Sequence, residues 1–363
     1  MVRKNILILT VLLSVLGIFN PNVSWADQHS EHEEEGGVNM KNQIFGHVND
    51  SHSWHIFSTA EGHDAKHFSI PLPVMVYNID AGKFDFFSSS KFEHGHASHA
   101  GYTEQQEGLK SGKLAREDGA KFFDFSITKN VLAMLIAIAF MLWLFLSIAK
   151  KYKSGQGATS APKGIQNAVE SVIQFVREQI AEPCLSKKNV KKFLPYLLTL
   201  FFFIWINNMF GLIPIFPGGA SFTGNFAVTV ALALIFFVIM LLSSKKGYWM
   251  HMLNPPGVPF GIKLLLVPIE IVSNLLIKPA ALAIRLFANM FAGHTIILSI
   301  ILLVSIFAGL AKVAGVVFLP VSIGFTIFMF CLELLVAAIQ AFIFTNLAAV
   351  FLGEAVAEHD DHH

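Results

Sequence analysis

The apolar stretch from Ile262 to Leu352 constrains this fold more than any other feature of the chain. Its one obvious break lies near Ala311 to Gly315, so the stretch predicts two helices of roughly 40 residues each. At 1.5 Å per residue each helix would be near 60 Å long, whereas an upright membrane span needs about 20 residues. We therefore expect both helices to tilt steeply or to run partly in the membrane plane, a shape suited to lying against a cylinder.

The rest of the chain is also rich in apolar runs. Hydrophobic residues make up 54% of the 363 residues and charged residues only 14%, which is typical of a membrane protein. Three further runs, at 131–148, 193–216 and 226–242, are long enough to be membrane spans, and lysine clusters follow the first and third. The sequence thus predicts an all-α polytopic membrane protein with about five passes and a small external N-terminal region.

Lysine clusters set the expected orientation. Because they mark cytoplasmic ends, the first span at 122–155 should leave the cluster at Lys150 to Lys153 inside. Apolar residues at helical spacing over 165–180 predict an amphipathic surface helix within a cytoplasmic segment at 156–192. A transmembrane hairpin at 193–246, the two long helices at 247–353 and a cytoplasmic tail at 354–363 follow.

The N-terminal third is expected to lie outside the cytoplasm. Residues 1–26 have the charged start, short apolar run and small residues of a secretory signal peptide; the alternative is a retained first membrane helix. Residues 27–121 are polar, contain short extended patches and hold ten of the fifteen histidines, so they are strand-containing or partly disordered. These histidines either bind Zn or Cu or form a solvated tract. A disulfide between Cys184 and Cys331 is not expected, because their surroundings differ.

Five polar side chains in the two long helices carry the candidate chemistry. Arg285 must stay charged inside the membrane, which is costly unless water or an anion compensates it. Glu270 is about 22 Å away along a helix, so a static salt bridge would need Glu333. Taken alone, each of these polar side chains could simply form a hydrogen bond between helices. The set favours an ion path and comprises Arg285, Asn289, His294, Glu333 and Gln340.

The motifs around these residues closely resemble subunit a of F-type ATP synthases. The resemblance covers roughly residues 120 to 355, and its motifs are Asn207–Pro214, Asn225, Lys278–Gly293, Glu333 and Gln340–Phe344. It implies that Arg285 faces a ring of c subunits and that Asn289, His294, Glu333 and Gln340 line a half-channel open to the outside. His occupies the first of two partner positions and Glu the second, an exchange relative to the best-known bacterial pattern that resembles the mitochondrial members.

The resemblance also implies partners and a place in the cell. The partners would be the c ring, subunit b of the peripheral stalk, the rest of the ATP synthase and lipid, with no nucleic acid. The location would be a bacterial inner membrane, with the N-terminal region outside and the C-terminus in the cytoplasm. The subunit would not be an enzyme by itself and would need no cofactor or resident metal. Indeed, the sequence holds no Gly-x4-Gly-Lys-Ser/Thr phosphate-binding loop.

Two other classes of protein compete with this interpretation. A metal-ion transporter would explain the external histidines, but its spans should offer paired His, Asp or Glu ligands, and here such residues are few and scattered. A membrane scaffold would have no use for a buried arginine beside a polar track. His294 with Glu333 favours protons over sodium as the coupled ion, although the c ring largely determines that choice in this family.

Overall fold

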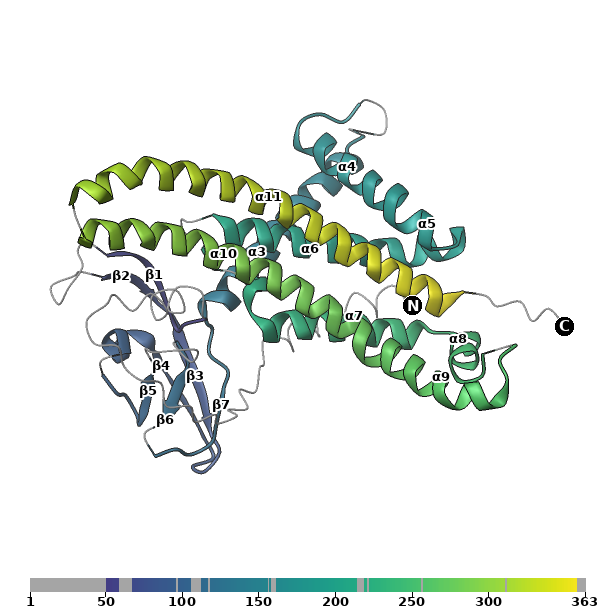
Figure 1. Cartoon of the computed structure of the whole chain (residues 1–363), viewed down its shortest axis with the longest axis horizontal. Coiled ribbons are helices and arrows are strands. Elements are labelled where there is room, and N and C mark those ends of the chain that lie inside the picture. Colours follow the sequence, from purple (N-terminus) through teal and green to yellow (C-terminus); the bar gives the residue numbers. More distant parts are fainter. Residues whose placement is uncertain are drawn as a thin grey trace. The chain divides into compact units, whose positions relative to one another are not determined.

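The computed structural model describes the parts of the chain that carry the folded N-terminal region and the helices (Figure 1). The described residues are 50–58, 67–95, 97–105, 112–116, 118–155, 157, 161–213, 219–220, 222–255, 257–310 and 312–357. The predicted signal peptide at 1–26 and the end of the predicted tail lie outside this set. So does His96, and the side chain of His94 is likewise not described.

Contacts within the chain define two compact units. Unit 1 comprises Met1–Leu135, Phe210–Asn225 and Asn289–Leu334. Unit 2 comprises Ile136–Met209, Phe226–Ala288 and Leu335–His363. Both long C-terminal helices therefore contribute to both units.

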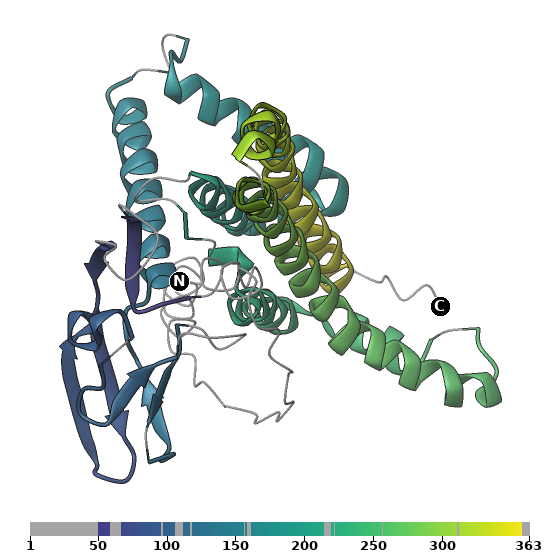
Figure 2. The same ribbon diagram turned by 60° about the vertical axis from the view of Figure 1, so that its left-hand side comes forward.

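The N-terminal part of unit 1 is a small β domain, drawn in purple and blue (Figure 2). Its seven described strands are β1 (Ser53–Ser58), β2 (His67–Pro71), β3 (Pro73–Asn78), β4 (Lys83–Ser88), β5 (Tyr102–Glu104), β6 (Leu114–Arg116) and β7 (Phe122–Asp124). All pairs are antiparallel: β1 pairs β2, β5 pairs β6, and β4-β3-β7 form a three-stranded sheet. A short 3₁₀ helix, η1 (Ser89–Gly95), follows β4.

The core of the β domain forms around apolar side chains at alternate positions of β3. Val74 and Val76 point to the same face and are fully buried, as expected for a half-buried strand. They cluster with Phe87, Phe92, Tyr102 and Leu114. The described part of 27–121 is therefore a folded domain with strands, not a solvated tract.

The boundary predicted between residues 121 and 122 is wrong. β7 (Phe122–Asp124), placed at the start of the first membrane segment, instead pairs with Val76–Asn78 of β3. The helix begins only at Lys129. The error arose because β7 has three residues, too few to show strand periodicity, and its partner is distant in sequence.

Five described helices are long and apolar enough to cross a membrane, which confirms the predicted all-α polytopic fold. The first three are α3 (Lys129–Lys153), α6 (Lys187–Leu212) and α7 (Phe226–Ser243). Lys150, Lys151 and Lys153 lie in the last turn of α3.

Two shorter helical segments flank the hairpin of α6 and α7. The predicted surface helix is α4 (Ile165–Phe175), which continues through a π-helical turn, η3 (Val176–Ala181), into α5 (Glu182–Cys184). Its apolar positions Val169, Val176 and Ile180 are buried, in agreement with the helical spacing. The sequence interpretation missed α8 (Lys246–Leu253), a separate helix of eight residues.

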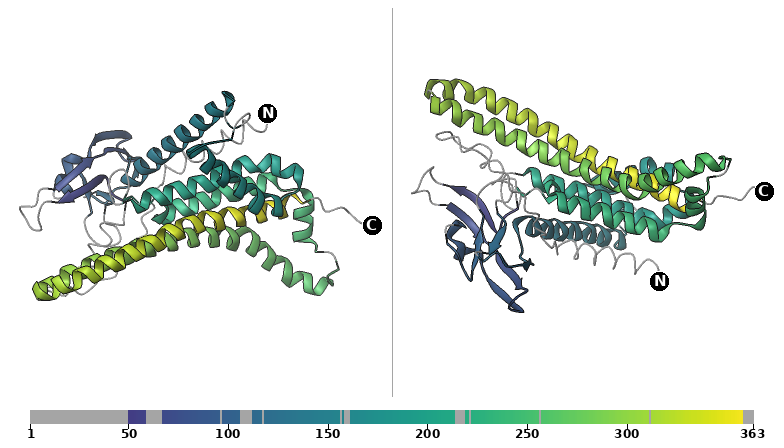
Figure 3. Two further views of the ribbon diagram at one scale, coloured as in Figure 1. Left: turned by 90° about the horizontal axis from the view of Figure 1, so that it is seen from above. Right: turned by 60° about the horizontal axis from the view of Figure 1, so that its bottom comes forward.

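The last two spans are unusually long, as predicted. α9 (Phe260–Val272), the π-helical turn η5 (Ser273–Ile277) and α10 (Lys278–Leu310) follow one another without interruption. α11 (Lys312–Val356) has 45 residues in one helix, drawn in yellow-green to yellow (Figure 3). The expected break near residue 311 therefore falls where α10 ends and α11 begins.

Candidate functional site

Arg285 lies on the exposed face of α10, in unit 2. The opposite face packs into the protein through Leu282, Ala283 and Leu286, which are almost fully buried. Arg285 makes no hydrogen bond or ion pair with any described residue of its own unit, which includes Glu270. The guanidinium group is therefore accessible at the surface of the isolated subunit.

Small side chains flank Arg285 on the same exposed face. Ala281, Ala288 and Ala292 lie one or two turns away along α10 and are exposed. Asn289, one turn after Arg285 and the first α10 residue in unit 1, is exposed on this face as well. Small residues on a membrane helix let a partner helix approach closely, so this face is shaped for contact with another helix.

Glu333 occupies a very different environment, inside unit 1. Its side chain on α11 is largely buried, and neither carboxylate oxygen has a hydrogen-bond partner among the described residues. Gly293 of α10 lies so close that a Cβ there would overlap Oε1 of Glu333. A buried acid without a partner is costly, so such a group in a membrane helix marks a functional position.

His294 follows Gly293 directly along α10. Its Nε2 is buried and has no hydrogen-bond partner among the described residues. Because Gly293 contacts the Glu333 side chain, the structure brings two titratable groups of the predicted path to one region of unit 1. Imidazole and carboxyl groups are the side chains best suited to pass protons near neutral pH.

Gln340 lies in the interior of unit 2. Its side chain on α11 is 1% exposed and is surrounded along the helix by the buried Ala337, Ala341 and Phe344. Glu333 and Gln340 are both buried on α11, as expected for residues seven positions apart on one face. The five predicted residues are thus divided: Arg285 and Asn289 are exposed, whereas Glu333, Gln340 and most of His294 are inside.

Two hydroxyl residues of the same α11 face were missed from sequence. Ser322 and Thr326 precede Glu333 by eleven and seven residues, so they share its face. Ser322 is buried, and its Oγ donates to the backbone oxygen of Ile300 at 3.2 Å. Regular spacing of Ser, Thr, Glu and Gln on one apolar helix was the available signal.

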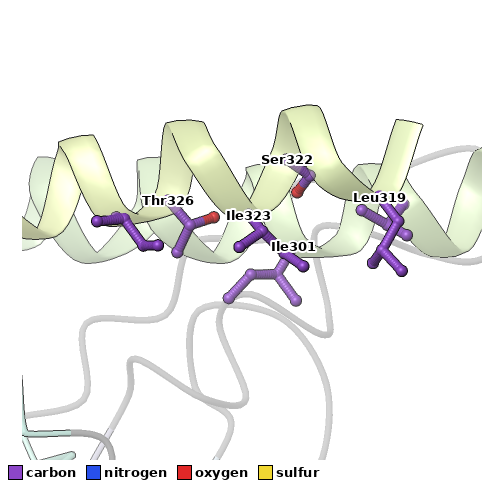
Figure 4. A pocket seen from close by; sticks show the side chains of 7 residues that line it. Ile301, Leu319, Ser322, Ile323 and Thr326 are labelled. Carbon is purple, nitrogen blue, oxygen red and sulfur yellow. The ribbon is translucent and has the colours of Figure 1, made fainter. Parts of the chain in front are cut away.

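An apolar pocket of about 340 Å³ lies beside these hydroxyls, between α10 and α11 in unit 1 (Figure 4). It is lined by Ile301, Val304, Leu319, Ser322, Ile323, Thr326 and Ile327. None of the five predicted residues lines it. Among the described residues, no three His, Cys, Asp or Glu side chains gather closely enough to hold a metal ion.

Comparison with known families divides the chain in two. Residues 131–353 match the family described as "ATP synthase A chain". Residues 43–129 match a separate family described as "Domain of unknown function (DUF8433)". The second match covers the β domain up to the first residue of α3.

Individual relatives agree with the first match. The chain is 43% identical over 245 residues to "ATP synthase subunit a 2" of Chlorobaculum tepidum, covering 66% of each chain. It is 41% identical over 247 residues to "ATP synthase subunit a" of Chlorobium phaeobacteroides, covering 66% of this chain and 68% of the relative. For the same subunit of Anaeromyxobacter dehalogenans the identity is 37% over 284 residues, covering 72% and 70%. The chain thus spans about two thirds of these relatives.

Proposed function

The chain belongs to the subunit a family of F-type ATP synthases, and we propose that it conducts protons between the membrane surfaces and the carboxylates of a c ring. As a multi-pass subunit of the membrane sector, it would offer two half-channels, each open to one side. Proton flow through them would turn the ring and thereby drive ATP synthesis elsewhere in the complex. On its own the subunit would catalyse no reaction.

The exposure of Arg285 carries this proposal. A guanidinium keeps its charge under all physiological conditions, and exposing it to lipid would cost several kcal/mol. Within its unit no described side chain compensates the charge, and the surrounding face is apolar with small residues. The compensating anion is therefore expected on a partner helix, which is the position of a c-ring carboxylate.

Electrostatics then gives Arg285 its role. Two unit charges about 4 Å apart interact by roughly 4 kcal/mol at an effective dielectric of 20. That is enough to keep a ring carboxylate ionised while it lies beside Arg285. The carboxylate would release its proton to one half-channel and be neutralised from the other before it rotates through lipid. A fixed positive charge between the half-channels would also oppose direct proton leakage.

The other four predicted residues would form the outer half-channel. Glu333 and His294 can bind and release protons, and Asn289 and Gln340 would hold water between them and the ring. The N-terminal region would lie outside a bacterial inner membrane, with the lysine-rich helix ends and the C-terminus in the cytoplasm. Subunit b and the c ring would be the direct protein partners.

The test is ATP-driven proton uptake by inverted membrane vesicles that contain the whole ATP synthase with either the parent subunit or Arg285→Ala. Proton uptake should be lost in Arg285→Ala, because no fixed positive charge then keeps a ring carboxylate ionised so that it gives up its proton. Assembly with the c ring is checked by copurification.

Arg177→Ala is the matched control. Arg177 pairs with Glu182 on the exposed surface of η3 and α5, so its loss removes the same side chain away from the proposed path. This variant should pump like the parent. Normal pumping by an assembled Arg285→Ala complex would refute the proposed role of Arg285.

A further inference from the structure

The three-stranded sheet β4-β3-β7 of the β domain (Figure 1) has an apolar outer face. Its inner face carries Val74 and Val76 of the core, and side chains alternate along a strand, so the outer face carries the residues between them. Phe84 and Phe86 on the outer face are 71% and 72% exposed, and Phe123 is 42% exposed. The residues of this aromatic face are Met75, Tyr77, Phe84, Phe86, Phe123 and Phe125.

The rings of the aromatic face form one continuous surface across the three strands. Tyr77 of β3 lies opposite Phe84 of β4 on one side and opposite Phe123 of β7 on the other. The ring centroids of Tyr77 and Phe84 are 4.7 Å apart, and those of Phe84 and Phe123 each lie 6.3 Å from the ring of Phe125. A contiguous apolar patch of this kind on a folded domain marks a contact surface.

Backbone hydrogen bonds continue the sheet beyond β7 toward the first membrane helix. The N–H of Phe125 donates to the backbone oxygen of Met75 at 2.9 Å, and the N–H of Ile127 donates to that of Pro73 at 3.3 Å. The segment between β7 and α3 is therefore held along β3 rather than free to swing.

At the next residues the β domain also holds the first turn of α3. The carboxylate of Asp50 accepts a hydrogen bond from the hydroxyl of Thr128 at 2.7 Å and from the backbone N–H of Asn130 at 3.1 Å, as a helix cap does. Apolar contacts secure the same junction, in a cluster that comprises Trp54, Ile70, Leu132, Ala133 and Ala220. The aromatic face and the start of α3 thus belong to one rigid structure.

The apolar length of α3 indicates how far the aromatic face is from the membrane. The apolar run at 131–148 is about 27 Å long, close to the thickness of about 30 Å of a hydrocarbon core, so Lys129 is expected at the level of the lipid headgroups. Phe125 is four residues earlier in the chain, so its Cα lies within about 14 Å of the Cα of Lys129. The aromatic face therefore begins at or just beyond the headgroup layer.

We propose that the aromatic face lies on the bilayer surface beside the N-terminal end of α3, with its rings among the lipid headgroups and the adjoining acyl chains. Removing exposed rings from water is favourable, and aromatic side chains are common at this depth of a bilayer. Lipid adjoins the start of a membrane helix wherever protein does not, so the occupant is already present at the right level. The inference goes beyond proton conduction and does not depend on it.

Apolar area rather than charge would drive this contact. Lys83 at the start of β4 and Lys121 just before β7 are exposed, but so is Asp80 in the turn between β3 and β4. Opposite charges near the same end of the sheet leave little net attraction for an anionic lipid. Vesicles of phosphatidylcholine, which has no net charge, should therefore be sufficient.

The experiment measures the collision accessibility of nitroxide labels on the full-length subunit in phosphatidylcholine vesicles, alone and within the complete ATP synthase. Phe84→Cys and Phe86→Cys place the labels on the aromatic face, in a background in which the free Cys184 and Cys331 are replaced by Ser. Both phenylalanines are largely exposed, so neither change removes a core contact. Oxygen concentrates in lipid and a nickel chelate stays in water, so the ratio of their collision rates reports which of the two surrounds the label.

Lys113→Cys is the matched control position. Lys113 is exposed and precedes β6, whose Leu114 packs on the inner face of the sheet, so a label there lies on the opposite side of the domain. The ratio of oxygen to nickel collisions should be several-fold higher at positions 84 and 86 than at 113. Adding Phe86→Asp should lower the ratio at position 84 to that of position 113, because a carboxylate opposes contact with lipid, whereas adding Lys113→Asp should leave it unchanged.

Equal ratios at positions 84, 86 and 113 would overturn the inference, since the aromatic face would then lie in water. A label at position 84 that collides with neither reagent would also overturn it, because protein would then cover the face. If that occurred only in the complete ATP synthase, the cover would be another subunit; if it required a high ratio of protein to lipid, the cover would be a second copy of this chain. The labels are read without ATP or a proton gradient, so failure of the proposed function would leave these ratios unchanged.

Discussion

Gly293 is the single residue whose substitution most directly tests the arrangement around Glu333. In Gly293→Ala, the new Cβ would overlap the Glu333 carboxylate, so either the acid moves or α10 and α11 separate. We expect ATP-driven proton uptake to fall by roughly tenfold or more, since small displacements of reacting groups are costly. The measurement is the initial rate of uptake per assembled complex in inverted vesicles.

Gly324→Ala is the control for this substitution. Gly324 lies on α11 in the same unit, and a Cβ there would meet nothing within 4 Å. It should transport like the parent, and helix propensity favours the change by up to about 1 kcal/mol. Unchanged uptake by Gly293→Ala would show that the position of Glu333 is not critical.

The sequence identifies the candidate polar residues of the long helices more readily than the contacts between those helices. Arg285, His294 and Glu333 stand out because charged or titratable groups are rare in apolar helices. The contact between Gly293 and Glu333 depends on the register of α10 against α11, which no local pattern of either helix encodes. The burial of Lys129 at the start of α3 likewise has no local signature, because it depends on contact with the β domain, where its backbone N–H bonds to Ser51.

At the scale of whole elements, one ion pair joins the start of α10 to the end of α11 in unit 2. Nζ of Lys278 is 2.7 Å from Oε2 of Glu354 and 4.7 Å from the ring centroid of Phe351. The Glu354 side chain is 49% exposed, so Glu354→Gln should destabilise the subunit by less than about 1 kcal/mol. Lys278→Ala should cost more, about 1–2 kcal/mol, because it also removes the contact with Phe351.

Denaturant unfolding of the purified subunit in detergent, at low and high salt, measures both losses. The effect of Glu354→Gln should shrink at high salt, whereas the excess effect of Lys278→Ala should persist. Glu182→Gln, in the exposed pair with Arg177, is the reference for a pair without an aromatic neighbour. A loss of several kcal/mol in Glu354→Gln would mean that this pair is far better shielded from solvent than its exposure indicates.

Elements with strong periodicity were the ones that sequence predicted well. The five spans and the surface helix α4 follow from long apolar runs and from 3.6-residue spacing. α8 combines Lys, Tyr, Trp, Met and His over eight residues and shows neither pattern. The strands of the β domain are three to six residues long, so only β3 and β4 were foreseeable as extended patches.

For the molecule as a whole, the N-terminal region shows why composition is a weak guide to the fold of a short segment. Its composition, rich in His, Glu, Ser and Gly, is typical of a solvated segment, yet the described part has a core of its own. That core depends on pairing between strands far apart in sequence, such as β3 with β7. Composition averages over such contacts, which is why it could not distinguish a small folded domain from a polar tract.

The buried pair of His52 and Asp124 makes the stability of this domain depend on pH. Burial alone would lower the pKa of His52, but the hydrogen bond and charge of Asp124, with the charge of Glu104, outweigh it and raise the pKa above 6.5. Burial alone would raise the pKa of Asp124, but the hydrogen bond and charge of His52, with bonds from Ser126, lower it below 3.8. The raised pKa of His52 contributes stability that is complete below pH 6.5 and is lost as pH rises through the folded value. The lowered pKa of Asp124 contributes stability present above pH 3.8 and lost as pH falls through its folded value.

The pair should therefore stabilise the domain most between about pH 4 and 6.5. Hydrogen-exchange protection of the β3 amides in the full chain, corrected for intrinsic rates, should fall several-fold as pH rises above the folded pKa of His52. A buried charged hydrogen bond contributes about 1.5–3 kcal/mol, which is sufficient for such a change.

Asp124→Asn should abolish this loss of protection at high pH, whereas Asp118→Asn, at an exposed carboxylate of the same domain, should retain it. If the protection were equally pH-dependent in Asp124→Asn, another group would have to be responsible. The ion pair between His52 and Asp124 would then not be the cause of the pH dependence of the stability of the β domain.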